Sequence, residues 1–138
     1  MSEAKFFLDN IPFIKDLGVE FVSAAQGRAV LALNLEARHL NGWAVAHGGV
    51  LMSLMDVAMA AAGRSLDPTV GAGVTVQMNS SFLQPGNAGT RLIASAHAIH
   101  RSSTLSFCEA EVRDTEGRLI AKAMGTFKFK KRQQQVND

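Results

Sequence analysis

The 138-residue sequence has one cysteine, little net charge and no long apolar run. The lone cysteine, Cys108, excludes an intrachain disulfide and fits a reducing compartment. The formal charge is only +2, and no aromatic residues interleave with the basic ones, which argues against a nucleic-acid binder. No apolar stretch reaches the roughly 20 residues that a membrane span needs. The N-terminus carries acidic residues and lacks the apolar segment of a signal peptide. We therefore expect a cytoplasmic protein that binds neither nucleic acid nor membrane.

Several catalytic and cofactor motifs are also missing. The sequence has no G-x-S-x-G elbow of a serine hydrolase and no glycine-rich loop of the Walker or dinucleotide type. It has no cysteine pair and no His-Glu helix motif that would hold zinc. His97 and His100 are three apart on a predicted strand, a spacing that puts them on opposite faces. The sequence therefore predicts no metal site.

The hydrophobic pattern predicts one long helix and six strands. The helix is expected at about 48–64, because Leu, Met and Ala dominate this run. The run is apolar on nearly every face, so we expect the helix to be buried on nearly every face and not amphipathic. The last three strands are joined by short links, as in an antiparallel meander. The strands are expected at 18–24, 28–35, 74–82, 90–100, 104–114 and 118–129.

The strand at 74–82 should present two different faces. Before it, Asp67-Pro68 and the glycines at 71 and 73 predict a connecting loop. Strict alternation places Thr75 on the polar face, together with Gln77, Asn79 and Ser81. The opposite face should carry Val74, Val76, Met78, Ser80 and Phe82.

The length predicts one domain, residues 1–138, with an N-terminal helix within 1–16 and a frayed tail at 130–138. A sheet of about six antiparallel strands has one apolar face that must be covered. The helix at 48–64 is the only element long and apolar enough to cover it. We therefore predict an α+β fold in which an antiparallel sheet wraps around one central helix.

One polar residue interrupts the predicted helix. Asp56 lies among Leu, Met, Val and Ala residues, where an unpaired carboxylate would cost several kcal/mol. At the start of the same helix, Gly48 and Gly49 leave backbone N–H groups without side-chain cover. A helix N-terminus of this kind can stabilise a developing oxyanion, and a buried carboxylate can serve as general base or nucleophile. The two features together suit the hydrolysis of an acyl compound.

The spacing of these groups requires a second subunit. Gly48 and Asp56 are eight residues apart, or roughly 12 Å along one helix. A scissile carbonyl needs both groups within about 3 to 3.5 Å of its reacting atoms. Two antiparallel helices in a C2 dimer bring the N-terminus of one beside the middle of the other. A catalytic site built from these groups therefore predicts at least a homodimer with two composite sites.

The order of Asn41, His47-Gly48-Gly49 and Asp56 resembles the hotdog-fold acyl-CoA thioesterases. The branch in question includes the phenylacetate-pathway thioesterase and human thioesterase superfamily member 2. The strand VTVQMNSSFLQP, residues 74–85, extends the resemblance. It implies the hotdog fold, an acyl-CoA substrate, no metal or redox cofactor, and commonly a tetramer built as a dimer of dimers.

The same resemblance implies catalytic roles for four residues. Asp56 would act as general base or nucleophile, and the Gly48 N–H would polarise the thioester carbonyl. Asn41 would orient substrate or water, and the Thr75 hydroxyl would help to hold the attacking water. Thr75 is also an ordinary strand residue, Asn41-Gly42 is also a common turn pair, and Asp56 could instead be a structural carboxylate bonded to a strand hydroxyl.

Contacts to the substrate are expected in three places. His47 and Gly49 belong to the turn at the helix start, where His47 suits a capping role better than chemistry. Leu51, Met52, Met55 and Met59 are candidates to line the acyl pocket, because Met-rich walls adapt to varied shapes. A turn with Arg101, Ser102, Ser103 and Thr104 offers donors for the CoA phosphates, although an arginine in a turn is often simply solvated.

Two alternatives to a thioesterase remain open. A hotdog hydratase or dehydratase acting on acyl thioesters typically pairs a catalytic His with an acid, a pattern this sequence lacks beyond His47. A non-catalytic acyl-CoA-binding protein would keep the pocket and would not need Asp56.

Overall fold

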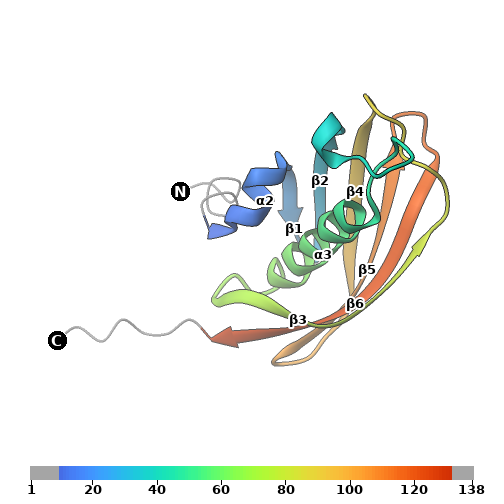
Figure 1. Ribbon diagram of the computed structural model, residues 1–138. Helices are drawn as coiled ribbons and strands as arrows, with labels where there is room; N and C mark the ends of the chain where they lie inside the picture. Colours follow the sequence, from blue (N-terminus) through green and yellow to red (C-terminus); the bar gives the residue numbers. More distant parts are fainter. Residues whose placement is uncertain (1–9, 132–138) are drawn as a thin grey trace.

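The computed structural model describes residues 10–131, which form one antiparallel sheet with a long helix across one face (Figure 1). The strand order is β1-β2-β4-β5-β6-β3. The sheet curves around helix α3, as predicted. The elements in chain order are α2 (Pro12–Leu17), β1 (Glu20–Ala25), β2 (Arg28–Asn34), the 3₁₀ helix η1 (Ala37–His39), α3 (Gly48–Arg64), β3 (Val70–Phe82), β4 (Arg91–Arg101), β5 (Leu105–Asp114) and β6 (Leu119–Lys131).

The core lies between α3 and the concave face of the sheet. The fully buried side chains of this core come from both layers and include Leu54, Met55 and Met59 of α3 and Leu31, Leu33, Leu92, Val112 and Phe127 of the strands. The sheet does not surround α3 completely. A strip of α3, consisting of Gly49, Met52, Ser53, Asp56 and Ala60, is exposed or half-buried in the described chain. The expectation of burial on nearly every face was therefore wrong for this strip.

Short turns fix the register of the strands. The loop of the β1–β2 hairpin consists of Gln26 and Gly27, and both residues have positive φ (53° and 79°). Positive φ at both positions is what a two-residue turn needs in order to match the twist of the two strands. Strands β4, β5 and β6 pair in sequence, which confirms the predicted meander. The first predicted strand begins later than expected, because Gly18, with φ 81°, ends helix α2 in the left-handed conformation.

Strand β3 differs most from the prediction. It starts at Val70, so the glycines at 71 and 73 lie in the strand and not in a loop. Its pairing with β6 shifts register between Thr75 and Gln77, which marks a β-bulge. Thr75 pairs with Phe127, which is fully buried against α3. The bulge therefore turns Thr75 toward the helix, onto the face of Met78 and Ser80. The prediction that Thr75 shares a face with Gln77 was wrong, because strict alternation does not continue through a bulge.

The chain ends differ modestly from the expectation. Helix α2 begins at Pro12, and the part of the predicted N-terminal helix before residue 10 lies outside the described residues. Strand β6 continues through Lys130 to Lys131, so it ends two residues later than predicted, and the rest of the predicted tail lies outside the described residues. Among residues 10–131, no helix has the length and apolar character needed to cross a membrane.

Candidate active site

The start of α3 presents one backbone N–H without a partner. His47 is the N-cap residue, and its Nδ1 accepts a hydrogen bond of 2.8 Å from the Gly49 N–H. The carbonyl of His47 accepts from Val50 N–H at 2.9 Å. A Cβ on Gly49 would lie 3.0 Å from His47 Nδ1, so a larger residue at this position would require the imidazole to shift by a few tenths of an ångström. Within the described chain only Gly48 keeps a free N–H in this turn, at the positive end of a 17-residue helix. The prediction that both glycine amides are free was wrong for Gly49.

A groove of about 410 Å³ opens beside this free N–H. Gly48 and Asn41 both line it, so the fold brings these two predicted site residues together. Asn41 also supports its own loop, because its Oδ1 accepts from Trp43 N–H at 2.9 Å and from Val45 N–H at 3.3 Å. The groove is lined by Asn41, Val45, Ala46, Gly48, Leu51, Phe82, Leu83, Gln84, Pro85 and Gly86.

Asp56 lies half-buried on the uncovered strip of α3. The Thr75 hydroxyl donates a hydrogen bond of 2.6 Å to Asp56 Oδ1. Burial raises the pKa of the Asp56 carboxyl, and the bond from Thr75 opposes that rise only in part. A raised pKa suits a general base, since the carboxylate gains affinity for a proton. The bulge in β3 is what brings the two side chains together.

Asp56 and Thr75 do not line the groove that contains Gly48. The eight residues between Gly48 and Asp56 span roughly 12 Å of helix. Within one chain, therefore, the carboxylate and the free N–H belong to separate places along α3.

The other predicted substrate contacts are spread over the molecule. Met55 and Met59 are both 0% exposed and pack in the core, and neither lines the groove beside Gly48, whereas Leu51 does. Arg101 stands at the opposite end of α3 from Gly48. Its Nη1 donates to the Gly63 carbonyl at 3.0 Å, and its guanidinium lies 4.5 Å from the centroid of the Phe129 ring. Arg101 is thus engaged with the end of the helix and is not simply solvated.

The turn that follows Arg101 has a structural role as well. Ser102 accepts a hydrogen bond of 3.1 Å from Leu105 N–H through its Oγ, which closes the β4–β5 turn. The side chains of Ser103 and Thr104 are exposed.

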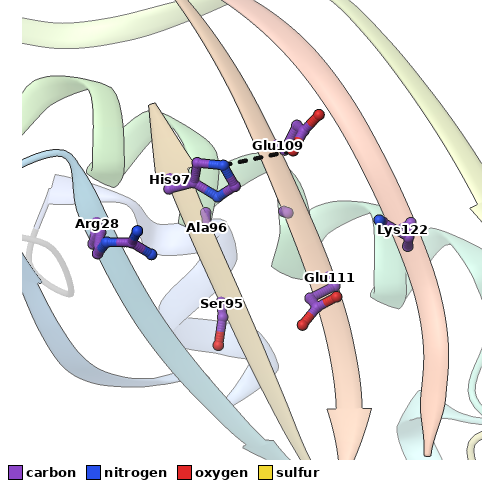
Figure 2. Close-up of a pocket in the computed structure, with 8 residues that line it drawn as sticks. Arg28, Ser95, Ala96, His97, Glu109, Glu111 and Lys122 are labelled. Atoms are coloured by element: carbon purple, nitrogen blue, oxygen red, sulfur yellow. Dashed lines mark ion pairs between the residues drawn. The ribbon is translucent and has the colours of Figure 1, made fainter. Parts of the chain in front are cut away.

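A second pocket, of about 270 Å³, lies on the outer face of the sheet (Figure 2). Its acidic groups have basic partners: Glu109 lies 3.5 Å from His97 Nε2, and Glu111 lies 2.9 Å from Arg113 Nε. A register shift between Ala98 and His100 places both histidines on this outer face, so the prediction of opposite faces was wrong. Among residues 10–131, no group of three or more His, Cys, Asp or Glu side chains could hold a metal ion.

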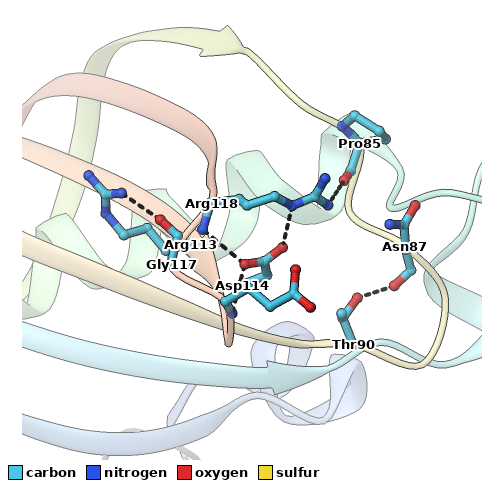
Figure 3. Close-up of polar contacts among 8 residues, drawn as sticks. Pro85, Asn87, Thr90, Arg113, Asp114, Gly117 and Arg118 are labelled. Carbon is cyan, nitrogen blue, oxygen red and sulfur yellow. Dashed lines mark hydrogen bonds and ion pairs between the residues drawn. The ribbon is translucent and has the colours of Figure 1, made fainter.

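Sequence reasoning missed the contacts that hold the groove wall. The buried Asp114 accepts from Arg118 Nε at 2.8 Å, and Arg118 Nη2 reaches the Pro85 carbonyl at 3.5 Å (Figure 3). The Arg118 side chain lowers the pKa of the Asp114 carboxyl. Phe82 was also missed as a site residue: a Cβ on Gly48 would lie 3.6 Å from its ring. The sequence contains no motif for the Arg118–Pro85 contact or for the Phe82–Gly48 contact, because each joins segments that are far apart along the chain.

The fold and the helix-start motif define a hotdog thioesterase, and the chain belongs to the thioesterase superfamily, whose family model matches residues 44–121. The Escherichia coli acyl-coenzyme A thioesterase PaaI is 32% identical over 120 residues, which cover 87% of this chain and 84% of that protein. Its solved structure aligns over 91% of this chain and 89% of that one, with a TM-score of 0.83 and 31% identity. The resemblance found in the sequence is thus confirmed.

Two further relatives extend the comparison. Human acyl-coenzyme A thioesterase 13 is 31% identical over 113 residues, covering 78% of this chain and 77% of that protein. A Streptococcus mutans protein solved with bound acetyl CoA has the same fold, with a TM-score of 0.76 at 23% identity, over 84% of this chain and 91% of that one.

Proposed function

We propose that this protein is an acyl-CoA thioesterase, which hydrolyses a thioester with water to a free acid and the CoA thiol. In this proposal the Gly48 N–H donates to the thioester oxygen and stabilises the oxyanion that develops there. Asp56 either takes a proton from the attacking water, or attacks the carbonyl itself, expels the CoA thiolate and forms a transient anhydride that water then hydrolyses to the free acid and the Asp56 carboxylate. Thr75 holds the Asp56 carboxylate, and Asn41 orients the substrate from the groove.

The observation that carries the proposal is the pair formed by Asp56 and Thr75. A half-buried carboxylate with a raised pKa, held by a hydroxyl at 2.6 Å, stands on a helix whose first N–H is free. A structural carboxylate would also need a hydrogen-bond partner, but it would not need to lie, as Asp56 does, on the strip of α3 that the sheet leaves uncovered. A non-catalytic acyl-CoA-binding protein has no need of the carboxylate, and a hydratase would place a histidine near the acid.

We further propose that the active unit is a homodimer with two composite sites. Strand β3 lies at an edge of the sheet and exposes Val74 and Val76 by 51% and 59%. Met52, on the uncovered strip of α3, is 40% exposed. Pairing of two such edges about a two-fold axis would cover these apolar groups and would place Gly48 of one subunit near Asp56 of the other. The dimer-of-dimers tetramer and the cytoplasmic location stay predictions from the sequence.

We assign the CoA phosphates to the β4–β5 turn, as the sequence predicts. Arg101 is already bound to the end of α3, so the exposed Ser103 and Thr104 are better placed to contact a ligand. His47 contributes indirectly, because its imidazole occupies the Gly49 N–H and leaves Gly48 as the donor. No metal or redox cofactor enters this mechanism.

The first test is release of free thiol from a panel of acyl-CoA substrates. We expect steady turnover with at least one acyl class. Tight binding of acyl-CoA without thiol release would favour the non-catalytic alternative, and a spectral change of an enoyl substrate without thiol release would favour a hydratase.

The second test uses Gly48→Pro, which removes the proposed donor. Proline is favoured in the first turn of a helix, and the extended backbone of His47 (ψ 135°) suits the residue before a proline. Gly48→Ala is the matched control, because it keeps the N–H and its Cβ would lie at ordinary contact distance from Phe82. We expect Gly48→Pro to lose about 10²-fold or more in kcat and Gly48→Ala to lose much less.

Mixing a variant that lacks the Gly48 N–H with a variant that lacks the Asp56 carboxylate tests the composite site. In a randomly exchanged equimolar mixture of Gly48→Pro and Asp56→Asn subunits, half of the dimers are mixed and each mixed dimer has one intact site. Exchange of subunits should therefore restore about a quarter of the wild-type activity. No recovery from a mixture that forms mixed dimers would refute a site shared between subunits.

A further inference from the structure

The groove beside Gly48 has the chemistry of an acyl pocket. None of its ten lining residues carries an ionisable side chain, and only Asn41 and Gln84 are polar. The nucleotide part of CoA bears phosphate groups, which require cationic or hydrogen-bonding partners. Val45, Leu51 and Phe82 instead offer apolar surface. The acyl end of a thioester therefore suits this groove better than the nucleotide end.

The Phe82 ring lies in the groove beside Gly48, whose N–H is the proposed carbonyl donor. A Cβ built on Gly48 would lie 3.6 and 3.7 Å from two carbons of the Phe82 ring. The ring is 51% exposed, so the core does not account for its placement. A carbonyl oxygen bound to the Gly48 N–H would put the first carbons of the acyl group beside this ring.

The wall that carries Phe82 is held in place on both sides. The Leu83 N–H donates to the Ile120 carbonyl at 2.8 Å, and the Ala46 N–H donates to the Gly86 carbonyl at 2.8 Å. A Cβ on Gly86 would lie 3.1 Å from the Ala46 methyl, so the two walls of the groove are in close contact there. A wall tied to its neighbours in this way cannot easily move to admit a larger group.

We propose that Phe82 determines the size of the acyl group that this enzyme accepts. The proposal rests on the proposed function, since it concerns the substrate of the same site. The phenyl ring limits the space next to the thioester carbonyl, and acyl groups compete for the volume that it leaves. A larger or smaller side chain at this position should change which acyl group reacts fastest, without changing the chemistry.

The test compares Phe82→Ala and Phe82→Trp over straight-chain and branched acyl-CoA substrates of increasing bulk. Removing the ring should raise the kcat/KM of bulky relative to small acyl groups by about 10-fold or more, the range expected when pocket volume changes. Enlarging it should shift the same ratio in the opposite direction. Phe13→Ala is the matched control, because Phe13 is a comparably exposed phenylalanine (62%) on α2 outside the groove.

The outcomes separate this inference from the proposed function. Opposite shifts with the two variants, and an unchanged profile with Phe13→Ala, would support it. If the wild type releases thiol but both Phe82 variants keep its acyl preference, the inference is overturned and the proposed function stands. If the wild type releases no thiol from any substrate, the proposed function itself fails. Should Phe82→Ala not fold, Phe82→Leu and Phe82→Trp provide the same comparison.

Discussion

The substitution Asp56→Asn separates catalysis from stability, because the structure predicts opposite consequences for the two. Asparagine has nearly the shape of aspartate, and its carbonyl oxygen can still accept the hydrogen bond of 2.6 Å from Thr75. It can neither take a proton from water nor attack a carbonyl. We expect kcat to fall at least about 100-fold, the lower end for loss of a general base, which corresponds to about 2.7 kcal/mol of transition-state stabilisation.

The same variant should be at least as stable as the wild type at neutral pH. Burial raises the pKa of Asp56 in the folded protein, so the ionised carboxylate costs the folded state free energy. At pH values below the ordinary carboxyl pKa, Asp56 is protonated in both states and the cost is absent. As the pH rises through the raised pKa, the wild type should lose stability relative to Asp56→Asn, and above that pKa the difference should stay constant.

Two measurements on the same preparations check this prediction. Thiol release gives kcat, and chemical denaturation at a fixed protein concentration and several pH values gives the free energy of unfolding. Near-normal turnover by Asp56→Asn would refute the catalytic assignment. A variant that is inactive and also markedly less stable at neutral pH would indicate instead that Asp56 is a structural carboxylate.

Three further predictions concern the surroundings of the site. Thr75→Val should lower kcat/KM and move the acid limb of the kcat/KM pH profile to higher pH, because the hydrogen bond that is lost favours the ionised form of Asp56. Thr75→Ser should keep both the wild-type kcat/KM and the wild-type pH profile. An unchanged pH profile for the valine variant would leave Thr75 as a plain strand residue. His47→Ala should cost about 1 kcal/mol of unfolding free energy, as loss of an N-cap does, and His47→Asn should restore it; denaturation curves that coincide for all three proteins would contradict the capping role. Asp114→Asn should lower the free energy of unfolding at neutral pH, and this loss should shrink in acid. The lowered pKa of Asp114 gives the wild type a contribution to stability that disappears only as the pH falls through that pKa. A loss of stability that does not depend on pH in denaturation experiments would count against this prediction.

The sequence was sufficient to predict the architecture because its main signals are local. The apolar run at 48–64 and the alternation in the strands gave the helix, the six strands and the meander with boundaries close to those observed. The helix-start glycines and Asp56 could be found for the same reason, since both lie on one continuous element. The family resemblance then identified the kind of reaction.

The errors arose where neighbouring segments decide the geometry. Two bulges, one near Thr75 and one near His100, changed the face of the residues beyond them, and alternation in the sequence contains no sign of either. Met55 was expected at the substrate because methionine suits pockets, but its position on the helix points it into the core. Burial direction depends on which side of the helix the sheet covers, and that is a property of the folded chain.

The bulge in β3 also limits how this strand can vary. Thr75 and Phe82 are separated by seven positions, an odd number, and yet both face α3, where they meet Asp56 and Gly48. Insertion or deletion of one residue between them would flip one of the two side chains to the opposite side while leaving the other in place. An insertion in this segment should therefore be tolerated only together with a matching deletion. Substitutions at its outward-facing positions are not restricted by this requirement.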